Sequence, residues 1–153
     1  MHAHALRTVP VLGIVLTALA VAFTAVACGG DSEETSTADV ISAISIMDSA
    51  GLHEIDESID NDKTIPGDAQ STAEKLQAIA LLTEWPTKDL ETQATNLAKI
   101  LGEMASALDS ENPDMAKVAQ AVQKAHDAEH DFSHEVWKHL HEEAGMGHSD
   151  GGH

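Results

Sequence analysis

The spacing of apolar residues predicts four helices between residues 38 and 144. Within each predicted helix, apolar side chains recur every three or four positions, which makes one face of the helix apolar. No segment shows the alternation of apolar and polar residues that marks a strand. The connections are short, and short connections place sequential helices antiparallel. The pattern predicts an all-α fold, an antiparallel up-down-up-down four-helix bundle, built from residues 38–60, residues 66–85, the segment that follows Pro86, and residues 113–144.

Proline, glycine and capping residues mark the ends and one interruption of these helices. Thr87 is a suitable N-cap for the third helix. Pro66 suits the first position of the second helix, and Pro113, behind Asn112, suits that of the fourth. Gly51 interrupts the first helix and predicts a kink there.

Polar residues interrupt the apolar stripe of the fourth helix. At about 100° per residue, Glu129 falls at the centre of the stripe and Ser133 lies close to it. His126 falls on the flank of the stripe, His130 at its boundary, and His134 on the side that faces solvent. If this helix were rotated by about 40°, Glu129 would be an ordinary acid on the flank. The two alternatives predict different surroundings for its carboxylate.

A second acid, Asp48, falls near the centre of the stripe of the first helix. At 1.5 Å per residue, Asp48 and His126 lie about 20 Å from the same end of the predicted bundle. A buried carboxylate without a partner is costly. Two inward acids near an imidazole therefore imply a cation, a proton or a hydrogen-bond network between them.

The same helix carries three histidines at a spacing of four, His126, His130 and His134. Residues four apart are neighbours on a helix, so two such imidazoles can bind one metal ion. The segment from His126 to His130 resembles the H-x-x-E-H helix motif of inverted zinc metallopeptidases. An enzyme of that type needs a further ligand and a substrate cleft, which a domain of this size does not offer, so no enzymatic activity is expected.

Residues 51–56 (GLHEID) resemble the GxHxxE segment of imelysin-type iron-uptake lipoproteins, with aspartate in place of glutamate. The resemblance covers six residues and adds His53 to the candidate ligands. The expected ion is a divalent transition metal, namely zinc, copper, nickel or iron, because these metals accept imidazole ligands. The predicted metal ligands are His126, Glu129, His130, His134, Asp48 and His53.

The N-terminal residues predict export and a lipid anchor. Arg7 precedes an apolar run that ends at Ala27, as in a secretory signal peptide. The only cysteine, Cys28, follows Ala25-Val26-Ala27. This segment resembles the lipobox of bacterial lipoproteins, which implies cleavage before Cys28 and acylation of its thiol. The expected location is the extracytoplasmic face of the cell membrane or outer membrane.

Composition completes the predicted organisation of the chain. Residues 1–27 are the signal peptide, residues 28–37 a lipidated tether, residues 38–144 the bundle, and residues 145–153 a flexible tail rich in His, Met and Gly. The net charge of −18 excludes nucleic acid as a partner, because phosphate recognition requires clustered Lys and Arg. We expect a lipoprotein that binds a metal for scavenging, buffering or delivery. The alternative is a metal-free adaptor that docks a protein partner through an acidic helical face.

Overall fold

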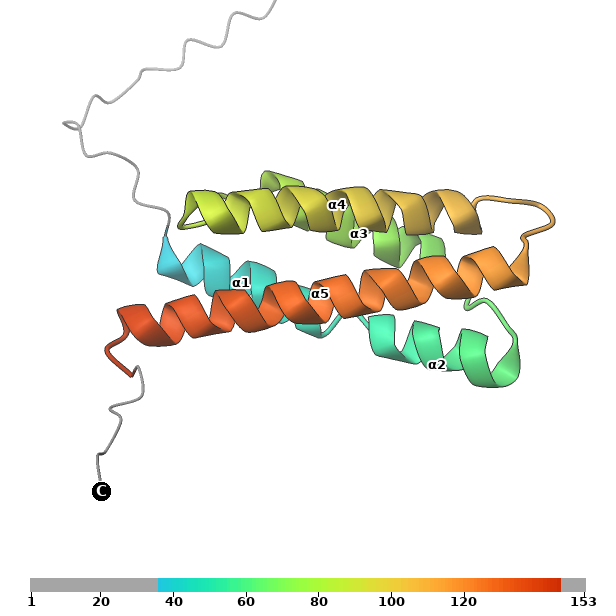
Figure 1. The fold of residues 1–153 in the computed structure, drawn as a ribbon, viewed down its shortest axis with the longest axis horizontal. Coiled ribbons are helices and arrows are strands. Elements are labelled where there is room, and N and C mark those ends of the chain that lie inside the picture. The colour runs from blue at the N-terminus through green and yellow to red at the C-terminus, as the bar shows by residue number, and fades with distance from the viewer. Residues whose placement is uncertain (1–35, 147–153) are drawn as a thin grey trace, which may run out of the picture. The chain divides into compact units, whose positions relative to one another are not determined.

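The protein is helical throughout the residues that the computed structural model describes, which are residues 36–146. Helices account for 78% of these residues and no strand occurs among them, so the predicted all-α class is confirmed. Five helices are found where the sequence predicts four (Figure 1): α1 (Thr37–Asp48), α2 (Leu52–Asp62), α3 (Ala69–Leu82), α4 (Lys88–Leu108) and α5 (Met115–Glu143).

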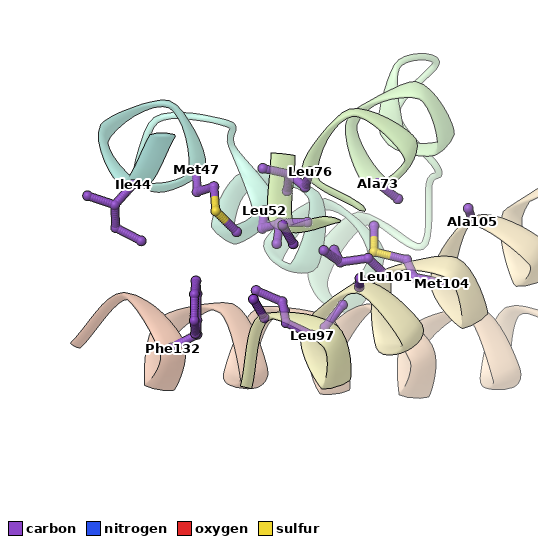
Figure 2. Close-up of a cluster of buried hydrophobic side chains, with 14 of the residues drawn as sticks. Ile44, Met47, Leu52, Ala73, Leu76, Leu97, Leu101, Met104, Ala105 and Phe132 are labelled. Carbon is purple, nitrogen blue, oxygen red and sulfur yellow. The ribbon is translucent and has the colours of Figure 1, made fainter. Parts of the chain in front are cut away.

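The first predicted helix is two helices, because the chain breaks at residues 49–51. Gly51 has a φ of 82°, in the left-handed region that a residue with a side chain rarely adopts. The predicted kink at Gly51 is therefore a complete interruption. Met47 and Leu52, on either side of it, both point into the core (Figure 2), so the break changes the direction of the chain without exposing apolar residues.

The helix starts agree with the predictions in one case and correct them in two. Oγ1 of Thr87 accepts a hydrogen bond from the Leu90 amide at 3.2 Å, which confirms Thr87 as an N-cap. The last helix is capped by Asp114, whose Oδ1 accepts from the amides of Ala116 and Lys117, so the start predicted at Pro113 was wrong. The second predicted helix begins three residues after Pro66, because Pro66 belongs to the preceding turn.

One apolar core joins all five helices. Helix α5 packs against α4, α1 and α2, while α3 packs mainly against α4 (Figure 1). At the centre of the core, Phe132 meets Trp85 edge to face, with 4.7 Å between ring centroids. The indole of Trp85 donates a hydrogen bond to the Ala80 carbonyl at 3.0 Å, which satisfies its one polar group. Helix α5 thus packs against three of the other four helices.

Several predictions concern residues outside the described range. The signal peptide, Cys28 and most of the tether lie before residue 36, and most of the predicted tail lies after residue 146. Between residues 36 and 146, no helix combines the length and the apolar character needed to cross a membrane.

Candidate functional site

A cavity of about 550 Å³ lies between the break after α1 and the middle of α5. Met47 and Asp48 from the end of α1 form one part of its wall, and the start of α2 forms another. Helix α5 supplies the remaining wall, including Ser133 and Trp137. All six residues predicted to bind metal line this one cavity: Asp48, His53, His126, Glu129, His130 and His134.

Glu129 is a buried acid whose charge has no satisfactory partner. Its side chain is only 7% exposed, which confirms the position at the centre of the apolar stripe. No hydrogen-bond donor among residues 36–146 reaches its Oε1 atom. Burial raises the pKa of Glu129, and the negative charge of Asp48 raises it further, while His126 and His130 act in the opposite direction. The cavity therefore contains a carboxylate that is stabilised when it binds a proton or a cation.

Two imidazoles in the cavity are each held by a carboxylate from α2. Nδ1 of His126 lies 3.3 Å from Oδ2 of Asp56, and Nε2 of His53 lies 3.5 Å from Oε1 of Glu57. The two imidazole rings are 5.3 Å apart between centroids. In each neutral imidazole, the nitrogen away from the carboxylate keeps a free lone pair.

Asp56 was not among the predicted site residues, although the sequence contains a signal for it. It occupies the acidic position of the GxHxxE-like segment, and it lies four residues after the buried Leu52, near the inward side of α2. Its other oxygen, Oδ1, is buried and receives no hydrogen bond from the described residues. Asp56 thus belongs to the same polar cluster as Glu129.

Asp48 lies in a different environment from the one predicted. It is an exposed residue at the end of α1, so its assignment to the centre of a buried stripe was wrong. Its carboxylate accepts hydrogen bonds from Ser133 Oγ at 2.5 Å and from Trp137 Nε1 at 2.9 Å. Asp48 therefore fastens the end of α1 to α5, with both of its oxygens engaged.

The partner of Asp48 also corrects the predicted register of the two helices. Asp48 was placed level with His126, but it meets Ser133, two turns further along α5, while His126 meets Asp56. The reason is that α1 and α2 do not form one straight rod of 1.5 Å per residue. His53 also lines the cavity, and its side chain is 64% exposed, in agreement with the outer face on which the helical period places it.

The two remaining predicted ligands are at the mouth of the cavity. His130 and His134 are both exposed, and the His134 side chain is 71% exposed, as expected for the boundary and the solvent side of the stripe. Within the described part of the chain, no three histidine, cysteine or acidic side chains lie close enough together to hold one ion. A shared ion would therefore require rotation of exposed side chains such as these.

Comparison with protein-family models, with curated proteins and with solved structures gives no match to this chain. The chemistry of the cavity is therefore the basis for assigning a function.

Proposed function

We propose that this protein binds a divalent transition metal in the cavity between α5 and the break after α1, and that its role is scavenging, buffering or delivery. The observation that carries the proposal is Glu129, a buried carboxylate without a hydrogen-bond partner on one oxygen, in a cavity lined by four histidines. A charge in this position is costly unless a cation accompanies it. None of the described residues that line the cavity is lysine or arginine, so the chain offers no permanent cation of its own there.

The carboxylates of α2 support the proposal because metal-binding histidines ordinarily donate their second nitrogen to such a group. Asp56 lies 3.3 Å from His126, in position to serve it in this way, and Glu57 lies 3.5 Å from the exposed His53. Two imidazoles bound to one tetrahedral ion, with bonds of about 2.0–2.1 Å, place their ring centroids about 5 Å apart. The observed 5.3 Å is close to that spacing, although the rings are not yet arranged around a common point.

The donor set suits borderline metals. Imidazole nitrogen and carboxylate oxygen favour zinc, copper(II), nickel and iron(II), and no cysteine occurs after Cys28 to favour a thiolate metal. In the proposed site, Glu129 and His126 bind the ion from α5, and His53 or His130 rotates to complete the set. Asp48 remains an anchor, since Ser133 and Trp137 already occupy its oxygens.

We also propose that the helices form an antiparallel up-down-up-down bundle in which α1 and α2 together make the first limb. The packing of α3 on α4 and of α4 on α5 supports this arrangement, as does the contact of both α1 and α2 with α5 (Figure 1). In this arrangement the cavity lies on the side of the bundle, at the break between α1 and α2.

The proposed location is the extracytoplasmic face of a membrane, with Cys28 acylated. Membrane fractionation of the Cys28→Ser variant tests this point, because loss of the lipid should release a folded domain. Unchanged partitioning into membranes would overturn the proposed anchor and leave the metal site unaffected.

The metal site is tested by thermal unfolding of the full chain with zinc, copper(II) or nickel. An ion that binds only the folded protein raises the melting temperature. We expect this rise to disappear in the His126→Ala/His130→Ala variant. A matched control, His139→Ala/His141→Ala, removes two imidazoles from the same helix outside the cavity and should keep it. A variant that lacks residues 147–153 should also keep it.

If the His126→Ala/His130→Ala variant is stabilised as much as the parent, the cavity is not the metal site. The acidic surface as a docking face for a protein partner would then be the better proposal. If only the variant without residues 147–153 loses the effect, the metal is bound by the tail.

A further inference from the structure

We infer that the cavity receives its metal together with a small neutral or cationic chelating molecule, and not as a bare ion. This inference rests on the proposed function and adds the chemical class of the ligand. Its starting point is the size of the cavity, about 550 Å³. Pockets of about 300–1,000 Å³ hold small organic ligands, whereas a protein site for a bare ion places its donors about 2 Å from the metal.

The protein supplies fewer donors than a transition metal takes. Zinc takes about four donors, and nickel or iron up to about six. The proposed site supplies three donors, namely Glu129, His126 and one of His53 and His130, and the described residues contain no preformed group of that number. The remaining positions of the ion face the open volume of the cavity, where a second molecule has room to fill them.

The charges of the lining restrict the class of that molecule. Asp48, Glu54 and Glu129 line the cavity, and none of its described lining residues is lysine or arginine. A negatively charged chelator such as a polycarboxylate would meet uncompensated like charge, which disfavours it. A neutral nitrogen-donor chelator leaves the complex positively charged and so complements the acids.

The apolar part of the wall adds a surface for a flat or apolar chelator. Met47 and Leu52 are buried residues that line the cavity, and Trp137 lines it from α5. The hydrogen bond from Trp137 Nε1 to Asp48 fixes the indole in place. An aromatic ring held in this way attracts a cationic complex through its face.

The experiment compares zinc in three forms by isothermal titration of the full chain. The probes are zinc alone, a preformed one-to-one complex of zinc with 2,2′-bipyridine, and a complex of zinc with nitrilotriacetate. We expect the bipyridine complex, which is flat and dicationic, to bind at least about tenfold more tightly than zinc alone, a difference within the range of a cation–π contact. We expect the anionic nitrilotriacetate complex to bind more weakly than zinc alone.

Two variants assign the advantage to the indole face. Trp137→Leu should remove the preference for the bipyridine complex, measured as the ratio of its affinity to that of zinc alone in the same variant. Trp137→Phe retains an aromatic face but cannot donate to Asp48, so it should keep part of the preference. If both variants keep the full preference, the role given to Trp137 is wrong.

The outcomes separate the inference from the proposed function. Binding of zinc alone without any advantage for the bipyridine complex overturns the inference and leaves the metal site standing. Bipyridine without metal is titrated as a control, and equally tight binding of it also overturns the inference, because the cavity would then be a site for an organic molecule alone. If zinc binds in none of its forms, the proposed function itself fails.

Discussion

Helix α4 and the α1–α2 pair are of similar length and both pack against α5, but α4 is continuous and the pair is interrupted. Helix α4 runs without interruption for 21 residues and buries eight apolar residues. Helices α1 and α2 have 12 and 11 residues and bury four and three apolar residues, respectively. The amount of buried apolar surface is thus comparable. The difference is that the α1–α2 pair interrupts its helical hydrogen bonds at residues 49–51, and the cavity opens there over α5.

This comparison shows where the molecule places its polar residues. Glu129 and Ser133 are the two buried polar residues in the described chain, and both lie on the part of α5 that lines the cavity. The acids that hold His126 and His53 come from α2, directly after the break. The buried polar residues thus lie where α5 faces the break between α1 and α2, whereas α4 buries only apolar residues.

The largest expected effect tests whether α4 and the α1–α2 pair differ in how tightly they are packed. Leu101 in α4 and Leu52 at the break are both buried, but only Leu52 lines the cavity. Leu101→Ala leaves a closed void and should lower the free energy of unfolding by about 3–5 kcal/mol. Leu52→Ala enlarges a space that is already open, so its cost should be nearer 2 kcal/mol. Urea denaturation measures both values, and equal costs would contradict the comparison.

A smaller effect tests the break itself. Gly51→Ala places a side chain on a residue with a φ of 82°, which should cost about 1–2 kcal/mol. Gly67 offers a matched control, because a Cβ atom there meets no heavy atom within 4 Å and φ is not in the strained region. Gly67→Ala should therefore be neutral or slightly stabilising. A Gly51→Ala variant as stable as this control would mean that the break does not depend on the left-handed conformation.

The residues that sequence analysis placed correctly are those on α5. An unbroken helix keeps one phase, so the period of the apolar residues located Glu129, Ser133 and the histidines relative to the core. The same reasoning failed for Asp48, because residues 49–51 reset the phase and the sequence gives no measure of that rotation. Asp56 was missed for the same reason.

The N-caps were likewise predicted correctly for one helix and wrongly for another. Thr87 stands alone in front of an apolar stripe and was predicted correctly. Asn112, Pro113 and Asp114 are three plausible starts in a row, and only the geometry of the turn selects Asp114.

The smallest expected effect separates the destabilisation caused by the buried charge of Glu129 from the proposed role of Glu129 as a metal ligand. Since burial raises the pKa of Glu129, the folded protein holds a proton that the unfolded chain releases near the ordinary pKa of 4.5. The stability of the parent should therefore fall as pH rises from about 4.5 through the folded-state pKa, and stay lower above it. Glu129→Gln has no such loss, so without metal it should be the more stable protein at pH 7. Asp127→Asn, an exposed change on the same helix, keeps Glu129 and should therefore show the same fall in stability with rising pH as the parent.

Addition of zinc should reverse the order of the two proteins. At a concentration of about 100 times Kd, the ion stabilises the parent by about 2.7 kcal/mol, which exceeds the cost of the buried charge. Glu129→Gln loses a charged ligand and should gain much less. Thermal unfolding from pH 4.5 to 8 measures the melting temperatures of both proteins. At pH 7, Glu129→Gln should have the higher melting temperature without zinc, and the parent should have the higher one with zinc. If Glu129→Gln is less stable than the parent even without metal, the carboxylate contributes to folding by itself, and its burial beside the break is not explained by metal binding.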